Sequence, residues 1–295
     1  MSLALSFLLL MAISQRSVSD PTASNSSDSR KLIFILAGQS NMAGRGGVYE
    51  NKWDHVVPTE SGPHQSILRL NAARVWQEAC EPLHADIDVH RTCGVGPGMV
   101  FANWVREPAK QAGWGLIGLV PCAVGGTRIR EWAQGTVLYQ QMIDRIKAAL
   151  ASGGKIGAVL WYQGESDTVK YEDAYSYGAL LKKLINDLRV DLNLPNLLFI
   201  QVGLASGEGP YMKIVRKAQK EIRLPNVKYV DALGLKLESD HLHLTTQSQV
   251  QLGIMLADSY LDSGLNGDGD SSQASWNKTK LKLLHALLLS LFSIL

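Results

Sequence analysis

The chain has 295 residues, enough for one large α/β domain or two small ones, and 46% of them are hydrophobic and 19% charged, as is typical of a globular protein. The formal net charge of +2 gives no basic excess of the kind that nucleic-acid binding requires. The densest basic stretch, residues 213–223, spaces its charges like the exposed face of an amphipathic helix, so we expect no nucleic-acid partner.

The first residues are typical of a targeting segment. The apolar stretch LALSFLLLMAI is followed by small residues near Ser14 and Ser19, where a signal peptide can be cleaved. A buried core helix is the alternative, but nothing close in the sequence would pack against it. We therefore predict a signal peptide over residues 1–19 and a secreted protein. The Ser/Asp/Asn-rich residues 20–30, with an N-glycosylation sequon at Asn25, are expected to form a flexible lead-in.

From residue 31 onward, apolar runs alternate with amphipathic helical patterns. The runs are continuous rather than alternating, which is typical of strands covered on both faces of a parallel sheet. The pattern predicts a three-layer α/β/α sandwich with a mostly parallel, five-stranded sheet. Residues 66–79 interrupt the alternation and indicate a short side hairpin. The five predicted strands are residues 31–37, 117–123, 156–162, 196–203 and 227–232.

Three of these runs are each followed by a short polar or glycine-rich segment at the point where the run ends. Ser40 in GQSNMAG follows the first run, Gly125 in VGGT the second, and Gln163 in YQGESD the third. In open parallel sheets, ligands bind at the carboxyl ends of the strands. We therefore expect these three segments to share one edge of the sheet.

An activated serine needs a base, a group that orients the base, and hydrogen-bond donors for the developing oxyanion. Asp240 and His243 stand three apart in ESDHLHLTT, before the last helical pattern. At that spacing the carboxylate can reach Nδ1 of the imidazole and leave Nε2 directed at Ser40. Alternatively, Asp240 caps a helix and both His241 and His243 are surface residues, because such a short pattern often arises by chance.

Three groups are candidate oxyanion donors: the backbone N–H of Ser40, the backbone N–H of Gly125 and the side-chain amide of Gln163. The glycines of VGGT also suit a turn that needs positive φ, and the two roles are compatible.

Two other chemistries would use neighbouring residues. Glu165 and Asp167 could be a glycosidase carboxylate pair, but they are only two residues apart and neither has an evident separate partner. Asp240, His241 and His243 could bind a metal ion, but no further His or Cys cluster supplies the remaining ligands. We expect neither a metal nor an organic cofactor.

The three cysteines cannot form a closed disulfide framework, and no pair has metal-ligand spacing. Cys122 lies inside the apolar run IGLVPCAV, so we expect a buried thiol there. Cys80 and Cys93 then remain as a candidate disulfide.

Five segments together resemble the plant carbohydrate esterases with a sialate O-acetylesterase-like domain, in the SGNH/GDSL hydrolase superfamily. The resemblance runs from about residue 31 to residue 261, and it implies the SGNH-type, flavodoxin-like sandwich. The segments, in the order of the family, are GQSNMAGRGG, GVGPGMVFA, VPCAVGGT, LWYQGESD and SDHLHLTTQSQVQLG.

The resemblance implies that Ser40 is the nucleophile and that Asp240 and His243 complete the catalytic triad. It matches Gly125, rather than Gly126, to the oxyanion glycine. Gln163 stands where other SGNH branches have asparagine.

Two further positions are notable in this resemblance. Glu165, in the QGES segment, is expected to hold its loop through hydrogen bonds. His241 departs from the family pattern DGLH, in which glycine directly follows the aspartate, so that a bulky residue replaces a flexible one between Asp240 and His243. A bulky residue there would narrow the site or act as a competing base.

The resemblance implies an esterase that removes O-acetyl groups from a plant cell-wall polysaccharide or a related acetylated sugar. We expect a monomer, secreted because of the targeting segment. The alternatives are an inactive carbohydrate-binding protein of the same fold, or an esterase for lipid or other small acyl esters.

The end of the chain lies beyond the resemblance. Residues 262–280 form a small, polar linker that cannot build a core, and residues 281–295 are a hydrophobic tail. The tail is shorter than the roughly 20 apolar residues of a membrane-spanning helix. Small residues near 269–272, a polar spacer and an apolar end match a GPI-attachment signal, which would anchor the protein to the plasma membrane. An amphipathic helix packed on the domain is the alternative.

Overall fold

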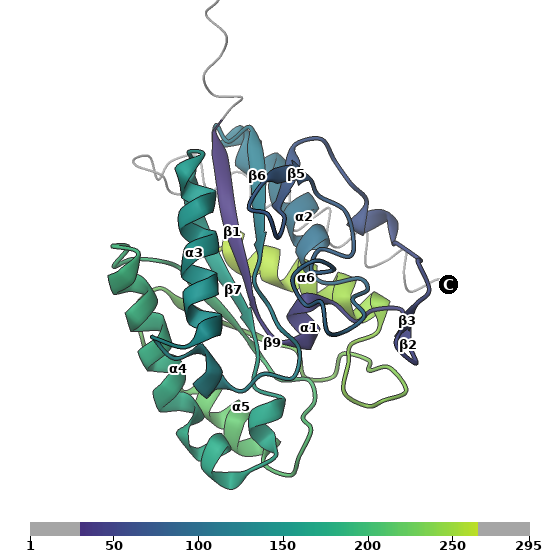
Figure 1. Cartoon of the computed structure of the whole chain (residues 1–295), viewed down its shortest axis with the longest axis vertical. Helices are drawn as coiled ribbons and strands as arrows, with labels where there is room; N and C mark the ends of the chain where they lie inside the picture. The colour runs from purple at the N-terminus through teal and green to yellow at the C-terminus, as the bar shows by residue number, and fades with distance from the viewer. Residues whose placement is uncertain (1–29, 265–295) are drawn as a thin grey trace, which may run out of the picture.

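A seven-stranded sheet with strand order β5-β4-β6-β1-β7-β8-β9 forms the centre of the computed structural model, which describes residues 30–264 (Figure 1). β5 is antiparallel to β4, and every other neighbouring pair is parallel. The strands are β1 (Lys31–Gly38), β4 (Ile67–Leu70), β5 (Trp76–Glu78), β6 (Leu116–Pro121), β7 (Lys155–Tyr162), β8 (Phe199–Gly203) and β9 (Val227–Asp231).

The central strand β1 is buried along its whole length, as its unbroken apolar sequence predicts. Near its carboxyl end Leu36 pairs with Pro121 of β6 on one side and with Leu160 of β7 on the other. The chain passes from β6 across β1 to β7, so β1 lies at the point where the strand order reverses. Such a switch point is where open α/β sheets place their ligand sites.

The predicted mostly parallel sandwich is confirmed, but the prediction of five strands is wrong. Residues 66–79 do form the expected hairpin, β4 and β5, yet it extends the main sheet instead of standing beside it. Ile67 of β4 pairs in parallel with Ile117 of β6. Without the hairpin, β6 would be an edge strand with unpaired backbone N–H and C=O groups, and β4 pairs with these groups. The hydrophobic periodicity of the sequence does not show which strand has such a free edge.

Helices cover both faces of the sheet (Figure 1). On one face α2 and α6 pack against each other; on the other face lie α3, α4 and α5, with α5 against α4. The helices are α1 (Ser40–Ala43), α2 (Gly98–Gln111), α3 (Val137–Ala151), α4 (Tyr171–Asp191), α5 (Met212–Lys220) and α6 (Thr246–Leu261).

Aromatic contacts anchor both layers of the core. Between the sheet and the α2/α6 layer, the ring of Phe34 lies 4.7 Å from that of Phe101 and 4.8 Å from that of Tyr260, edge to face. On the opposite face the ring of Trp161 lies 5.3 Å from that of Trp132. Such pairs add stability beyond their buried area, so the central strands are held rigidly from both sides.

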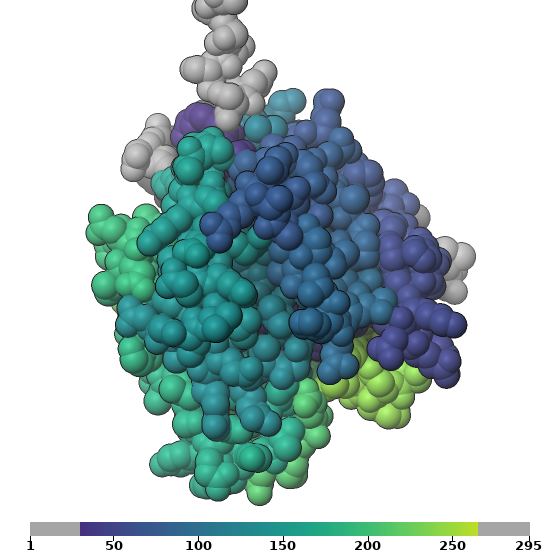
Figure 2. All heavy atoms as spheres, viewed as in Figure 1, coloured from purple at the N-terminus to yellow at the C-terminus, as the bar shows by residue number. Residues whose placement is uncertain are grey.

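The connection from β1 to β4 carries a two-stranded hairpin, β2 (Val48–Tyr49) and β3 (Lys52–Trp53), and the short helix η1 (Thr59–Ser61). In Figure 2 this surface, drawn purple to blue, adjoins the yellow-green surface of the chain before and within α6. The N–H of Gly47 donates to Glu238 of that later segment. Residues almost 200 positions apart therefore meet at the rim of the sheet.

The candidate disulfide between Cys80 and Cys93 is not formed, because all three cysteines are free thiols. Cys80 is exposed, whereas the Cys93 thiol is buried and accepts a hydrogen bond from Arg45 at 3.4 Å. Cys122 is buried, as its apolar run predicts.

The predictions for the two ends of the chain concern residues beyond the described range. The signal peptide, the Asn25 sequon and the hydrophobic tail all lie outside residues 30–264. Within that range, no helix combines the length and the apolarity that a membrane crossing needs.

Arg145 of α3 joins the hairpin to the sheet and provides a test of the fold. Its guanidinium donates to the carbonyl oxygens of Leu70 at 2.6 Å, Asn71 at 3.0 Å and Pro121 at 2.8 Å. We expect Arg145→Met to lower the free energy of unfolding by about 3 kcal/mol, since it leaves buried acceptors unpaired. Urea unfolding would measure this, with Lys147→Met on the exposed side of the same helix as the control. Equal losses in the two variants would contradict the prediction.

Candidate active site

Ser40 begins α1 directly after the carboxyl end of β1, and it is only 5% exposed. Gly38 has φ 127°, and a Cβ atom on it would overlap the carbonyl oxygen of Tyr162. Only glycine tolerates both constraints. The Gln39 N–H then donates to the Tyr162 carbonyl at 2.8 Å. This tight turn ends the strand and places the Ser40 side chain at the edge of the sheet.

The structure brings Ser40, His243 and Asp240 together, as the sequence predicts. Nε2 of His243 lies 2.9 Å from Oγ of Ser40, and Nδ1 of His243 lies 2.6 Å from Oδ2 of Asp240. The two contacts use both ring nitrogens. The histidine and aspartate side chains are 21% and 49% exposed, so the chain of hydrogen bonds runs from a nearly buried hydroxyl to the surface.

The loop before α6 keeps the Asp240 side chain ionised. Oδ1 of Asp240 accepts the backbone N–H groups of Leu242 and His243, each at 2.9 Å. Partial burial acts to raise the pKa of Asp240, but these two bonds and the His243 ring outweigh it and hold the pKa below its ordinary value. An anion next to Nδ1 selects the tautomer whose Nε2 can accept a proton from Ser40.

The two histidines of the loop have different environments. His241 is exposed and has φ 57°, in the left-handed region that favours glycine. Glycine, which the resemblance leads us to expect at this position, would adopt this conformation without strain. The imidazole ring that contacts both Ser40 and Asp240 belongs to His243. His241 therefore does not occupy the position of the base in this structure.

Asn41 is a residue whose importance the sequence analysis missed. Its Nδ2 donates to Oε1 of Glu165 at 2.8 Å, and its Oδ1 accepts the N–H of Leu244 at 2.9 Å. Its carbonyl accepts Nε2 of Gln249 in α6 at 3.1 Å. The residue after the serine therefore holds the chain directly after His243 and the first turn of α6. The only sequence signal is an amide directly after Ser40.

Glu165 and Asp167 do not form a glycosidase pair. Glu165 is fully buried against Asn41, and Asp167 accepts the backbone N–H of Ile129 at 3.0 Å. Burial raises the pKa of Glu165 to about 7 and that of Asp167 to about 6, although hydrogen bonds oppose the shift in both. Both side chains hold the QGES loop, as was expected of Glu165.

Gln163 is not an oxyanion donor, contrary to the sequence prediction. Its side chain is fully buried, and its Nε2 donates to Asp167 at 2.6 Å and to the Thr127 carbonyl at 2.8 Å. It does not line the pocket that contains Ser40. Its amide instead joins the turn after β6 to the turn after β7.

Gly125 lies beside Ser40, but its N–H is already engaged. A Cβ atom on Gly125 would lie 3.5 Å from the Ser40 Cβ, whereas the Gly125 N–H donates to Oδ2 of Asp88 at 3.1 Å. Asp88 also forms a buried ion pair with Arg45. The predicted role of Gly125 as an oxyanion donor is therefore not met in this structure. Gly126 of the same turn also lines the pocket.

A polar pocket of about 370 Å³ opens over the serine, a size within the usual range for small-molecule sites. Among residues 30–264, no group of three or more His, Cys, Asp or Glu side chains could hold a metal ion. The pocket is lined by Ser40, Arg45, Val48, Glu50, Asn51, Arg91, Thr92, Gly125, Gly126, Glu208, Asp240, Leu242 and His243.

The chain is similar to known proteins over nearly all of the described range. A family model described as "Carbohydrate esterase, sialic acid-specific acetylesterase" matches residues 30–262. A curated relative from Arabidopsis thaliana, "Probable carbohydrate esterase At4g34215", is 55% identical over 237 residues, which are 78% of this chain and 90% of the relative.

Solved structures agree with the fold. The X-ray structure of the Arabidopsis protein is 54% identical, with a TM-score of 0.76, and the match covers 79% of this chain and 98% of that one. NanS is 17% identical with a TM-score of 0.62, over 79% of this chain and 97% of its own. A carbohydrate acetylesterase from Xanthomonas citri is 20% identical with a TM-score of 0.54, over 76% and 55% respectively. The latter two show the fold alone.

The buried carboxyl group of Glu165 predicts a pH-dependent stability. Its pKa in the folded state is raised from 4.5 to about 7, so between these values the folded protein keeps a proton that the unfolded chain has lost. The contribution of this group to stability is thus fully present below pH 4.5 and is lost as the pH rises through 7.

Glu165→Gln keeps an acceptor for Asn41 but does not titrate. Relative to the wild type, we expect the variant to gain on the order of 2–3 kcal/mol of unfolding free energy between pH 4.5 and pH 8. Urea unfolding of both proteins across this range would measure the difference, and the comparison at pH 4.5 is the internal control. A difference between the two proteins that stays constant with pH would contradict the burial argument.

Proposed function

The chain belongs to the carbohydrate esterase family of the sialic acid-specific acetylesterase type, and we propose that it is a serine hydrolase that removes O-acetyl groups from a plant cell-wall polysaccharide or a related acetylated sugar. The observation that carries the proposal is the continuous hydrogen-bond chain from Ser40 through His243 to Asp240 beside a polar pocket. The identity to a plant protein supports a plant substrate.

In the first half of the reaction, Oγ of Ser40 attacks the carbonyl carbon of the ester while Nε2 of His243 takes the hydroxyl proton. The 2.9 Å contact between the two atoms is within reach for this transfer. Asp240 accepts the Nδ1–H bond and stabilises the imidazolium that forms, and its lowered pKa keeps it ionised for this role.

The tetrahedral intermediate places negative charge on the former carbonyl oxygen. As the first residue of α1, Ser40 has no intrahelical partner for its N–H, which makes it the first candidate donor. With the Gly125 N–H engaged by Asp88, the Gly126 N–H in the same turn becomes the second candidate. The glycine turn allows an acetyl group to approach the backbone closely.

Collapse of the intermediate breaks the bond to the sugar oxygen, which receives the proton from His243 and leaves as a hydroxyl. A water molecule then attacks the acetyl-Ser40 ester, with His243 again taking the proton, and acetate is released with Ser40 regenerated. The carboxylate, amide and hydroxyl side chains of the pocket, among them Glu50, Asn51 and Thr92, suit a substrate rich in hydroxyl groups.

Removal of the serine hydroxyl tests the proposal directly. We expect Ser40→Ala to lower kcat for acetate release from a small aryl acetate by at least ~1000-fold, since the nucleophile has no substitute. Ser40→Ala activity equal to wild type would exclude Ser40 as the nucleophile. A folded wild type that is inactive on aryl acetates, acetylated xylan and acetylated pectin would favour the inactive carbohydrate-binding alternative. Activity confined to longer acyl chains would favour a lipid esterase.

A pair of histidine variants separates the base from its neighbour. His243→Ala should cost about as much activity as Ser40→Ala, because members of a triad act as a unit. The matched control is His241→Gly, which relieves a left-handed backbone at an exposed position and should keep most of the rate. Acetate release measured under saturating substrate compares the two. A larger loss in His241→Gly would show that the base is not His243.

A further inference from the structure

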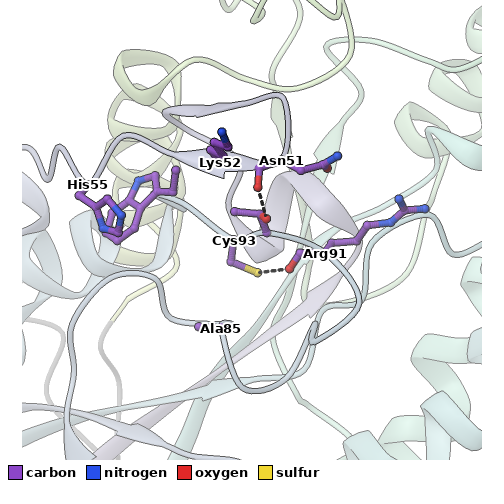
Figure 3. A pocket seen from close by; sticks show the side chains of 8 residues that line it. Asn51, Lys52, His55, Ala85, Arg91 and Cys93 are labelled. Carbon is purple, nitrogen blue, oxygen red and sulfur yellow. Dashed lines mark hydrogen bonds between the residues drawn. The ribbon is translucent and has the colours of Figure 1, made fainter.

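A second and larger hollow adjoins the pocket of the triad. Its volume is about 510 Å³, and three of its residues, Asn51, Arg91 and Thr92, line the triad pocket as well. Figure 3 shows His55 on one side of this hollow and Arg91 on the other, with Lys52 and Asn51 between them. We call it the β3 hollow; its lining is Asn51, Lys52, Trp53, His55, Ala85, Arg91, Thr92 and Cys93.

The walls of the β3 hollow are tied to each other and to the active site. Oγ1 of Thr92 donates to the carbonyl of Asn51 at 2.7 Å, which joins the loop before α2 to the β2–β3 hairpin. Gly46 and Val95 pair as an isolated β-bridge beside it. Arg45, which lines the triad pocket, donates to the thiol of Cys93 in the hollow. The two hollows therefore form one preformed groove.

The charge of the β3 hollow differs from that of the triad pocket. The triad pocket holds Glu50 and Glu208 beside its cations, whereas the β3 hollow has Lys52 and Arg91 and no Asp or Glu in its lining. Both cations are exposed, and neither forms an ion pair with any residue in the range 30–264. Two unpaired cations around one concave surface favour an anionic ligand.

The β3 hollow also offers ring surfaces. The rings of Trp53 and His55 lie 4.7 Å apart with an interplanar angle of 47°. Aromatic side chains with a few convergent polar groups are the usual lining of small-ligand sites, and a ring can cover the apolar face of a sugar. A sugar that carries a carboxylate has such an apolar face and also a negative charge that can pair with Lys52 and Arg91.

We propose that the β3 hollow is a subsite for a uronate residue of the same glycan chain whose acetylated sugar occupies the triad pocket. This inference rests on the proposed esterase function and names its substrate class as an acetylated acidic polysaccharide. Because Arg91 lines both hollows, it lies where the two neighbouring sugars would join. Carboxylate recognition by Lys52 and Arg91 then positions the neighbouring ester over Ser40.

Binding of non-acetylated oligosaccharides tests the subsite without reference to catalysis. Isothermal titration calorimetry of the wild type should show tetragalacturonic acid binding at least about fivefold tighter than xylotetraose, with the preference weakening as salt rises. Lys52→Glu should abolish this preference. The matched control is Lys228→Glu, an exposed lysine on the edge strand β9 outside both hollows, which should retain it. Thermal unfolding verifies that both variants are folded.

Kinetics then relates the subsite to the reaction. With acetylated galacturonan fragments, Lys52→Glu should raise KM about five- to tenfold relative to the wild type, while acetylated xylo-oligosaccharides show no such rise. Equal binding of the two tetrasaccharides, or a preference that survives in Lys52→Glu, overturns the subsite and leaves the esterase proposal intact. Selective binding of tetragalacturonic acid without acetate release from any ester would instead overturn the esterase and retain the subsite.

Discussion

The alignment of the candidate active site depends on one buried amide. Asn41 is bonded through its side chain to Glu165 and to the N–H of Leu244, and through its carbonyl to Gln249. These contacts join the helix that carries the serine to the loop after β7, to the loop that carries the histidine and to α6. Together with the bond from Gly47 to Glu238, they hold the loop in which His243 makes its 2.9 Å contact with Ser40. Precise geometry at such sites requires support of this kind.

The side chains that hold the active site in place include buried carboxyl groups, and burying these groups costs stability. Burial raises the pKa of Glu165 to about 7 and that of Asp167 to about 6, so ionising either one opposes folding near neutral pH. In return, Asp167 and Gln163 hold the turns after β6 and β7 together, and Asp88 with Arg45 holds Gly125. The residues that line the pocket are thus positioned by buried side chains beneath it, and of these Arg45 also lines the pocket.

The long connection after β1 contributes to both hollows of the groove. It supplies Ser40 at its start, Val48, Asn51 and Trp53 in the hairpin, and His55 after it. The sheet fixes only the first of these; the remainder is held by contacts such as the one from Thr92 to Asn51. The proposed chemistry therefore rests on the rigid sheet edge, while the proposed subsite is formed by a short hairpin at its rim and by the loop before α2.

Five adjacent strands of the sheet, from β6 to the edge strand β9, and the meeting of Ser40, Asp240 and His243 follow from the sequence. Unbroken apolar runs mark buried parallel strands, turns at strand ends gather at one edge, and a three-residue spacing links Asp240 to His243 locally. The tertiary structure alone decided that β4 and β5 extend the sheet, that Gln163 and the Gly125 N–H bond to Asp167 and Asp88, and that Cys80 and Cys93 stay apart. The packing of segments that are distant in the sequence decides which acceptor each donor meets and which strand pairs with a free sheet edge. The spacing of residues along the chain does not specify that packing.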